Sequence, residues 1–376
     1  MSEPLSKIPS GMRYYFGQEA RLRRAVEDAV VSVFTGWSYE EITTPSVDYY
    51  ALFERGMGRE EAHRAVRFMD GDGRLLALRP DMTSSVARAA ATLFAERPRP
   101  LRFCYAAPVF RQQPHSHAEW RRESTQLGCE LIGPGGAAAD MEVLAIAVEV
   151  LAKLGLWQHC SITLNSVEVF NGIAEGLALD PAARDEMRRL IDMRDAAELG
   201  RFLTPRTSSA TERAAFGRLT QLSGKRETLH QARRVITNKR STNALDELEQ
   251  LWKMIEALNL TDRFEIDLGD VLELDYYTGL VFRIYISGAG TRVGRGGRYD
   301  SLTANFGRTE PAIGFVLDLE ALTDVLAKTD SAFAGESNKP NEVVPLACDD
   351  EARLLVEATE RRRRGERIRI DFASES

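Results

Sequence analysis

The spacing of hydrophobic residues predicts its clearest helix near the N-terminus, in QEARLRRAVEDAVVSVFTGW. The apolar residues that recur there at helical intervals are Leu22, Val26, Ala29, Val30, Val33 and Phe34. They share one helix face, which we expect to pack against a core. The next run, EEITTPSVDYYALF, contains β-branched residues followed by Pro45. It predicts a short strand that stops or bends at the proline.

Further strands are predicted before the middle of the chain. Residues 64–95 are expected to form a strand, an Asp-Gly turn, a second strand and a helix. LRFCYAAPVF and ESTQLGCELIG are two apolar runs separated by a polar loop that holds Pro114, His115 and His117. We expect an antiparallel pair joined by a long loop of functional importance.

The pattern changes in character near residue 170. Before this point, MEVLAIAVEVLAKLG predicts a helix capped by Asp140 at its start and by Gly155 at its end, and SITLNSVEVF predicts a strand. The segment from about 170 to 260 carries helical patterns rich in Arg, Glu, Ala and Leu. Strand patterns then return, and PAIGFVLDLEALTDVL predicts a strand followed by a helix.

The order of these elements indicates an α+β fold. Strands that follow one another through turns, with helices grouped apart, are typical of an antiparallel sheet flanked by helices. We therefore expect a core formed by residues 1–168 and 263–328, with a helical insertion at 169–262. Residues 329–376 are expected to form a polar linker and a strand-helix-strand piece that is too small for a full domain.

Composition and charge narrow the function classes. The chain has 376 residues, of which 44% are hydrophobic, so it can bury a large core. Its net charge of -7 argues against wrapping by nucleic acid, which requires a basic surface. The four cysteines form no Cys-x-x-Cys pair and the five histidines add no zinc spacing, so we expect reduced thiols and no metal site. Neither a secretory signal nor a membrane span is predicted, and a cytoplasmic location fits.

Two glycine-rich stretches invite comparison with a dinucleotide-binding turn. GPGGAAADMEVLAIA opens a helix but lacks the G-x-G-x-x-G spacing, and no parallel βαβ repeat surrounds it. GAGTRVGRGGRYD is followed by no crossover helix of the right length. Loops that allow close backbone approach are therefore favoured at both places.

Four ordered segments resemble the catalytic core of histidyl-tRNA synthetase, a class II aminoacyl-tRNA synthetase. They are TPSVDYYALF, LALRPDMTSSVARA, APVFRQQPHSHAEWRRESTQLGCELIG and the group LDYYTGLVF, GRGGRYDSL and AIGFVLDLEAL. The resemblance covers residues from about 8 to 328. It implies the class II antiparallel sheet flanked by helices, with a helical insertion, and a self-dimer formed through the first motif around Pro45.

The same resemblance implies a pocket for histidine. In the family an acid and a threonine hold the histidine ammonium, and tyrosines wall the imidazole. Acceptors between aromatic walls suit a cationic amine attached to a planar ring. Each residue alone is more typical of a core tyrosine or a surface acid, but together, at family spacing, they favour the pocket. The implied histidine-binding residues are Asp81, Thr83, Arg111, Gln126, Glu130, Tyr276 and Tyr277.

Three positions at which the family handles ATP are changed. The adenine-binding acid is Gln113, the histidyl-specific arginine is Leu272, and the third-motif arginine is Ala321. Charge-assisted hydrogen bonds contribute roughly 1.5 to 3 kcal/mol each. Losing two arginines therefore costs on the order of 3 to 6 kcal/mol, or about a hundred- to ten-thousandfold. Glycine-loop arginines that could compensate are Arg292, Arg295 and Arg298, although Arg298 matches an arginine of the family itself.

The chain also ends soon after this core, where the synthetases continue into a complete anticodon-binding domain. Together the departures resemble the regulatory subunit of ATP phosphoribosyltransferase, a family of histidyl-tRNA synthetase paralogues. That resemblance implies a non-catalytic subunit that joins the short-form catalytic subunit in a hetero-octamer. It would activate the first step of histidine biosynthesis and transmit allosteric feedback by histidine. Magnesium would be needed only at the partner's active site, and this chain would hold no cofactor.

Two alternatives stay open at this point. The chain could be an active histidyl-tRNA synthetase with diverged motifs, which Leu272, Ala321 and the missing domain disfavour. It could also be a free-standing histidine sensor or a transferase that reuses the same core. Pyrophosphate exchange would reveal the first, and the absence of a phosphoribosyltransferase partner would favour the second.

Overall fold

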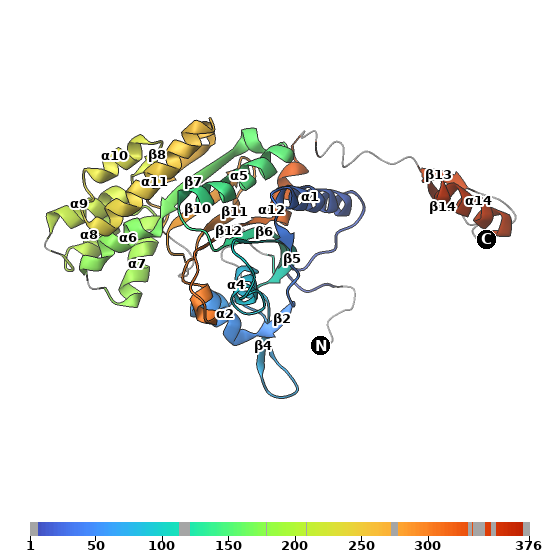
Figure 1. Ribbon diagram of the computed structural model, residues 1–376, viewed down its shortest axis with the longest axis horizontal. Coiled ribbons are helices and arrows are strands. Elements are labelled where there is room, and N and C mark those ends of the chain that lie inside the picture. Colours follow the sequence, from blue (N-terminus) through green and yellow to red (C-terminus); the bar gives the residue numbers. More distant parts are fainter. Residues whose placement is uncertain are drawn as a thin grey trace.

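A nine-stranded sheet runs through the main body of the molecule (Figure 1). The computed structural model describes residues 7–112, 121–177, 179–207, 209–271, 277–329, 333, 343–346 and 351–370. The strands, in spatial order, are β1 (Glu40–Glu41), β5 (Leu101–Phe110), β6 (Glu123–Ile132), β12 (Ala312–Asp318), β11 (Arg292–Arg298), β10 (Leu280–Ile286), β7 (Cys160–Ser166), β9 (Phe264–Asp267) and β8 (Ser223–Gly224). Neighbours are antiparallel except for β1 with β5 and β7 with β9. The predicted α+β class and the antiparallel β5–β6 pair are confirmed.

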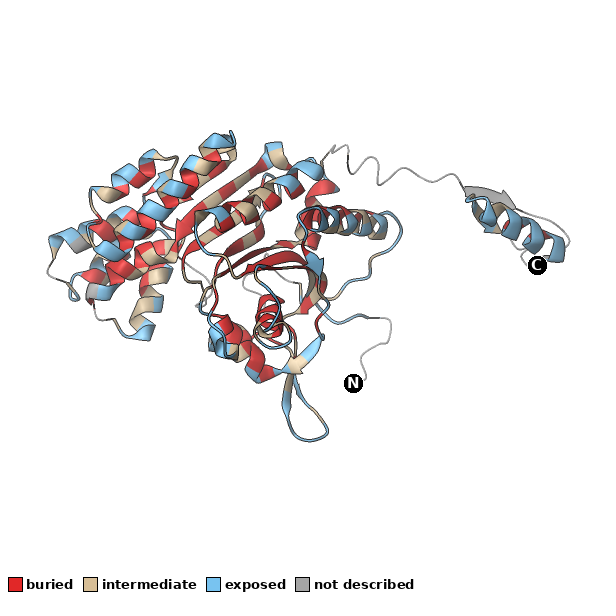
Figure 2. Cartoon of the chain, viewed as in Figure 1, coloured by how far each residue is buried: buried red, intermediate tan, exposed pale blue. Residues whose placement is uncertain are grey.

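Helices cover one face of this sheet and enclose the larger core. They are α1 (Gly17–Gly36), α5 (Ala137–Lys153), α11 (Lys239–Ala257) and α12 (Leu319–Leu326). All six apolar residues that predicted the first helix are buried in α1. Figure 2 shows the same division, with buried residues along the sheet and on the inner sides of the helices. Strand β6 contributes Leu127, Cys129 and Leu131 to this core. The alternate residues of β6 therefore face the other side of the sheet.

The second face of the sheet packs against the segment around Pro45. Its elements are β2 (Val47–Tyr49), α2 (Tyr50–Met57), α3 (Arg59–Ala62), β3 (Arg67–Met69), β4 (Leu75–Leu78) and α4 (Thr83–Ala91). Helix α4 and strand β5 share a second core cluster, to which Val86 and Tyr105 belong. The three short strands form their own sheet in the order β2-β4-β3. Pro45 lies between β1 and β2, as the predicted interruption requires.

Helices dominate the chain between β7 and β9. They are α6 (Val167–Ala174), α7 (Pro181–Asp192), α8 (Ala196–Leu203), α9 (Ala210–Leu219) and α10 (Glu227–Arg233), followed by α11. Short 3-10 turns lie at Trp157–His159, Glu175–Leu177, Thr261–Arg263 and Thr303–Phe306. The helical character of this region matches the prediction. The proposed division of the chain into three domains stays a prediction.

Two local predictions are wrong. The strand predicted through SITLNSVEVF ends at Ser166, and α6 begins at Val167 because Val169, Phe170 and Ile173 are buried at helical spacing. Asp140 does not cap α5, whose N-cap is Gly136. Asp140 lies in the first turn instead, where it accepts a 3.0 Å hydrogen bond from Arg298 Nε. The predicted C-terminal glycine is confirmed, since Gly155 follows the helix with a φ of 71°.

The C-terminal piece has the predicted strand-helix-strand order. It consists of β13 (Val343–Leu346), α14 (Glu351–Arg363) and β14 (Arg367–Ile370), with β13 and β14 parallel. Its small apolar cluster is centred on Leu354 and Ala358.

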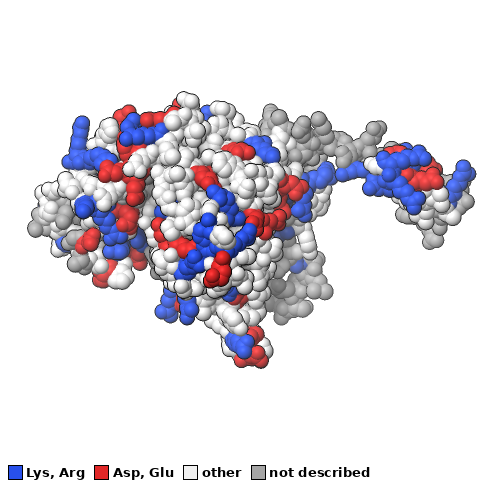
Figure 3. Space-filling model, in the orientation of Figure 1, with Lys and Arg blue, Asp and Glu red and all other residues white. Residues whose placement is uncertain are grey.

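Over the face of the molecule drawn in Figure 3, acidic and basic side chains are interspersed. Among the described residues, no helix combines the length and apolar character needed to cross a bilayer.

Candidate functional site

Two adjoining cavities lie where β6, β11 and β12 meet on the side of the sheet that faces α4. The inner cavity, of about 20 Å³, is lined chiefly by acids, hydroxyls and rings. The outer cavity, of about 100 Å³, is lined chiefly by arginines. Both are bordered by Gln126, Arg295 and Val316, so the two adjoin at these residues. The inner cavity lies where the strand register places Gly314 of β12 opposite Glu130 of β6.

Glu130 is the most heavily bonded group of the inner cavity. Its buried carboxylate accepts hydrogen bonds from Thr83 Oγ1 at 2.9 Å, from Tyr105 at 3.0 Å and from the hydroxyl of Tyr299. Burial raises the pKa of Glu130 to about 7, although the three hydroxyl donors act in the opposite direction. A Cβ atom on Gly314 would lie 1.8 Å from Glu130 Oε2, so only glycine leaves room for this carboxylate.

Asp81 and Gln126 supply further acceptors to the same cavity. Asp81 precedes α4, is 4% exposed, and accepts a long 3.4 Å hydrogen bond from the Ser84 amide. Burial raises the pKa of Asp81, whereas the charges of Arg111 and Arg295 lower it. Gln126 is 6% exposed, and its buried Oε1 has no hydrogen-bond partner among the described residues. A buried unpaired acceptor costs about 1–3 kcal/mol, which a donor on a ligand would recover.

Tyr277 forms an aromatic wall of the inner cavity. Its ring approaches β11 so closely that a Cβ atom on Gly297 would lie 2.8 Å from Tyr277 Cε1. The glycine therefore allows the ring to lie against the strand. Its predicted companion, Tyr276, lies outside the described residues.

Arginines surround the outer cavity, and acids accompany several of them. Those lining it are Arg64, Arg111, Arg121, Arg292 and Arg295. Arg64 pairs with Glu61 at 3.1 Å, and Arg121 pairs with Asp324 at 2.7 Å. Arg111 donates from Nε to the Pro80 carbonyl at 3.1 Å. Burial and the charges of Arg295 and Arg64 lower the pKa of Arg111 to about 10, so an anion nearby would be stabilising.

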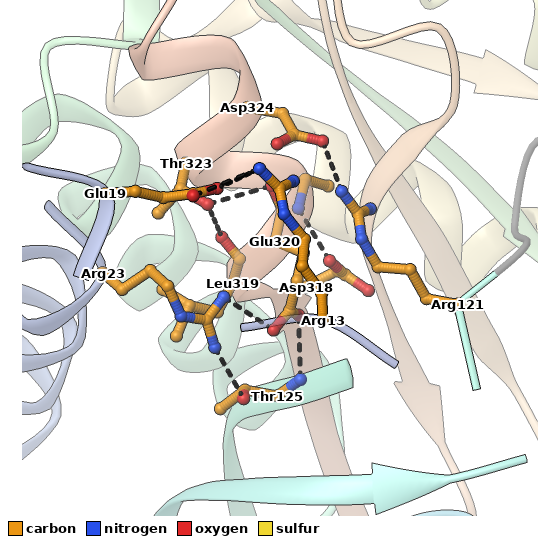
Figure 4. A network of polar contacts seen from close by, with 11 residues as sticks. Arg13, Glu19, Arg23, Arg121, Thr125, Asp318, Leu319, Glu320, Thr323 and Asp324 are labelled. Atoms are coloured by element: carbon orange, nitrogen blue, oxygen red, sulfur yellow. Dashed lines mark hydrogen bonds and ion pairs between the residues drawn. The ribbon is translucent and has the colours of Figure 1, made fainter. Parts of the chain in front are cut away.

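The start of α12 lines the outer cavity through Asp318 and Ala321. Figure 4 shows the polar contacts that surround this helix start. Asp318 caps this helix by accepting a 2.7 Å hydrogen bond from the Ala321 amide. Burial and the neighbouring Glu320 raise the pKa of Asp318. Glu320 turns toward α1, where it pairs with Arg23 at 2.7 Å and accepts the Thr125 amide at 2.8 Å. This helix start therefore presents a carboxylate and a methyl group to the cavity.

The structure brings most of the predicted site residues together. Asp81, Thr83, Gln126, Glu130 and Tyr277 line the inner cavity. Arg111 and Ala321 line the outer one, on which Gln126 also borders. The remaining predicted positions, Tyr276, Gln113 and Leu272, lie outside the described residues.

The structure also separates the three glycine-loop arginines. Arg292 and Arg295 line the outer cavity, so it retains guanidinium groups. Arg298 instead pairs with Asp140 and with Asp300 at 3.0 Å. Sequence reasoning missed Arg64, Tyr105 and Tyr299 as neighbours of the site. Tyr299 belongs to the quoted GGRYD segment, which is the one signal that could have identified it.

Comparisons with known proteins agree on one family. The histidyl-tRNA synthetase family model matches residues 11–322. An ATP phosphoribosyltransferase regulatory subunit of Moorella thermoacetica is 37% identical over 370 residues, which cover 98% of this chain and 93% of the relative. One from Syntrophotalea carbinolica is 35% identical, with 87% of this chain and 76% of the relative covered.

Two solved structures have folds similar to that of this chain. A crystal structure described as an ATP phosphoribosyltransferase regulatory subunit/histidyl-tRNA synthetase from Bacillus halodurans has a TM-score of 0.86 and 27% identity, and the match covers 100% of this chain and 95% of that one. Histidyl-tRNA synthetase from Nostoc, with a TM-score of 0.77 and 21% identity over 100% of this chain and 88% of that one, supports the class II fold alone.

Proposed function

This chain belongs to the ATP phosphoribosyltransferase regulatory subunits, which are paralogues of histidyl-tRNA synthetase. We propose that it activates a short-form catalytic subunit and makes that enzyme responsive to histidine. It is a regulatory subunit and not the catalyst itself, with a role in histidine biosynthesis. The effector would bind with its ammonium group in the inner cavity and would extend toward the outer one. The catalytic partner would supply all the chemistry and any magnesium, and a cytoplasmic hetero-octamer is the assembly that we propose.

The observation that carries this proposal is the buried Oε1 of Gln126, which has no partner among the described residues and lines the same cavity as Asp81. Two acceptors in one small cavity suit the ammonium group of an amino acid. Tyr277 offers an aromatic wall for the ring of histidine. Because such coupling is reciprocal, histidine that weakens substrate binding to the complex must itself be bound less tightly when substrate is present.

The outer cavity supports binding without activation of an amino acid. Adenylation depends on positive groups that stabilise phosphoryl oxygens. Here Ala321 and Asp318 form the floor, and Glu61 and Asp324 already pair with two of the arginines. With acids beside two of its arginines and a carboxylate in its floor, the cavity offers less positive charge to phosphoryl oxygens than its number of arginines suggests.

An exposed apolar sheet supports the proposed self-dimer. The small sheet β2-β4-β3 carries large hydrophobic residues with 39–59% exposure, namely Val47, Tyr49, Phe68, Met69 and Leu75. The register places Val47, Tyr49 and Phe68 on one face of this sheet and Met69 and Leu75 on the other. Exposed apolar residues gathered on one face are typical of an interaction surface. They lie beside Pro45, around which the class II dimer is expected. Light scattering tests this assignment, because Phe68→Lys should yield a monomer while Leu355→Lys, at an exposed residue of α14, should leave the dimer intact.

Reconstitution tests the function as a whole. A short-form catalytic subunit is assayed for condensation of ATP with phosphoribosyl pyrophosphate, alone, with this chain, and with this chain plus histidine. We expect activity only with the chain present, and inhibition when histidine is added. No activation by the chain would contradict the proposal. Histidine-dependent pyrophosphate exchange by the chain alone would instead favour a diverged synthetase.

A further inference from the structure

The two cavities carry opposite charge at opposite ends. Two carboxyl groups, those of Asp81 and Glu130, line the inner cavity, and Glu130 accepts hydrogen bonds from Thr83 and Tyr105. Five arginines line the outer cavity, where Asp318 is the one acid among the described lining residues. The acidic and the basic lining meet directly, because Gln126, Arg295 and Val316 border both cavities. Such a gradient matches a zwitterion better than it matches either an amine or an anion alone.

The volumes require a ligand that spans the boundary. A cavity of about 10–15 Å³ holds one water molecule, so the inner cavity, at about 20 Å³, has room for little more than water. An amino acid must therefore extend into the outer cavity of about 100 Å³. With its ammonium near Asp81, its carboxylate comes to lie at the shared boundary, among guanidinium groups.

Arg295 is the arginine at that boundary. It lies on β11 opposite Val316 of β12, and Val316 also borders both cavities. Its charge acts on Asp81 at one side and on Arg111 at the other. Of the five arginines that line the outer cavity in the described part of the chain, Arg295 alone also lines the inner one. A carboxylate placed between Arg295 and Arg111 would offset the repulsion between these two cations.

We propose that Arg295, together with Arg111, binds the carboxylate of the amino-acid effector, so that the site accepts a free α-amino acid and rejects the corresponding amine. This inference rests on the proposed histidine site and adds the residue that selects for the carboxylate. Arginine suits the role because its planar fork binds carboxylates in a bidentate manner. Arg295 thus supplies positive charge to both cavities.

Calorimetry with two ligands tests the inference on the full chain, alone and with its catalytic partner. L-Histidine carries the carboxylate, and histamine lacks it but keeps the ring and ammonium. We expect the wild-type chain to prefer histidine by about 10- to 100-fold, the worth of one or two charge-assisted hydrogen bonds. In Arg295→Gln the preference should fall to a few-fold, because histidine binds more weakly while histamine binds as before. Unchanged histamine binding also shows that the variant is folded.

Arg292→Gln is the matched control, because Arg292 lies on the same strand and lines only the outer cavity. It should retain the wild-type preference. Equal loss of both ligands in Arg295→Gln, or an unchanged preference, would overturn the assignment while leaving the histidine site standing. A wild-type chain that binds neither ligand, even with its partner, would remove both proposals. A further contrary outcome is that inorganic phosphate stabilises the wild-type chain but not Arg295→Gln, and fails to compete with histidine. This result would overturn the carboxylate role of Arg295 and would favour a separate phosphate-binding site.

Discussion

The inner and outer cavities share walls, yet they are built differently. In the inner cavity a single carboxylate, Glu130, receives three hydroxyl donors, and the neighbouring Gln126 keeps an unpaired acceptor. In the outer cavity the arginines are numerous, but Asp318 lines the cavity with them, and Arg64 and Arg121 pair with Glu61 and Asp324. The comparison teaches that a binding site for an amino acid depends on a few buried, well-placed acceptors. Abundant positive charge, by contrast, does not make a site for polyphosphate when acids accompany it.

The largest expected effect comes from filling the space beneath Glu130. In Gly314→Ala the new Cβ would meet Glu130 Oε2 at 1.8 Å and the Cys129 carbonyl at 2.5 Å. We expect the free energy of unfolding, measured in urea, to fall by roughly 2–4 kcal/mol, because overpacking and a broken buried network add together. Histidine binding should be lost as well. Gly135→Ala, whose Cβ would lie 3.6 Å from Pro311, is the control and should change little. Equal stability of the two variants would contradict this description of the inner cavity.

Removing an inner acceptor or the aromatic wall should weaken the response to histidine while the complex still assembles. For Asp81→Ala we expect histidine inhibition to require about 10- to 100-fold more histidine, since a buried charged partner of the ammonium is lost. Tyr277→Ala should act in the same direction. Asp72→Ala is the control, because its side chain is 74% exposed in a turn. Unchanged inhibition curves for both Asp81→Ala and Tyr277→Ala would place histidine elsewhere, such as at the subunit interface.

Titration of Glu130 gives the inner cavity a pH dependence. Burial raises the pKa of Glu130 from 4.5 to about 7. Its contribution to stability is therefore fully present below pH 4.5 and is lost as the pH rises through about 7. An ammonium ligand favours the charged carboxylate, so histidine affinity should rise severalfold between pH 6 and pH 8, roughly as far as one titrating group allows. Calorimetry should also show proton release on binding. Glu130→Gln should bind histidine with an affinity that is flat over this range, and a persisting slope would assign it to another group.

The smallest effect is expected at the rim of the outer cavity. Arg121 and Asp324 pair at 2.7 Å with side-chain exposures of 20% and 41%. Such pairs contribute about 0–1 kcal/mol, so Arg121→Gln should change stability little and histidine affinity by less than about threefold. Thermal unfolding and calorimetry measure both quantities. A large loss of histidine affinity would show that the outer arginines act together. It would contradict the claim that Arg295 has a distinct role in binding the carboxylate.

The sequence predicted the fold class. It also predicted five of the residues that line the inner cavity, because the motifs keep their family spacing. It could not predict that Tyr105 and Thr83 donate to Glu130, since these residues come from three elements that only the folded sheet brings together. The SITLNSVEVF prediction was wrong because alternation of valines is compatible with a strand, while burial of Phe170 and Ile173 stabilises a helix.

Electrostatic balance was equally hard to predict. Counting absent arginines from Leu272 and Ala321 suggested a cavity poor in guanidinium groups. The structure places Arg64 there, which no motif indicated, together with Arg292 and Arg295 of the glycine loop. It also turns Arg298 away, toward Asp140 of α5. Charge at a site is a sum over elements that are remote in sequence, so spacing along one motif cannot give it.

The most direct test of the account is a crystal structure of the chain with L-histidine bound. We predict that the histidine ammonium lies within hydrogen-bonding distance of Asp81 and Gln126, with its carboxylate directed toward Arg295. Histidine bound elsewhere, or bound with its carboxylate in the inner cavity, would contradict the central claim that one zwitterion spans the two cavities.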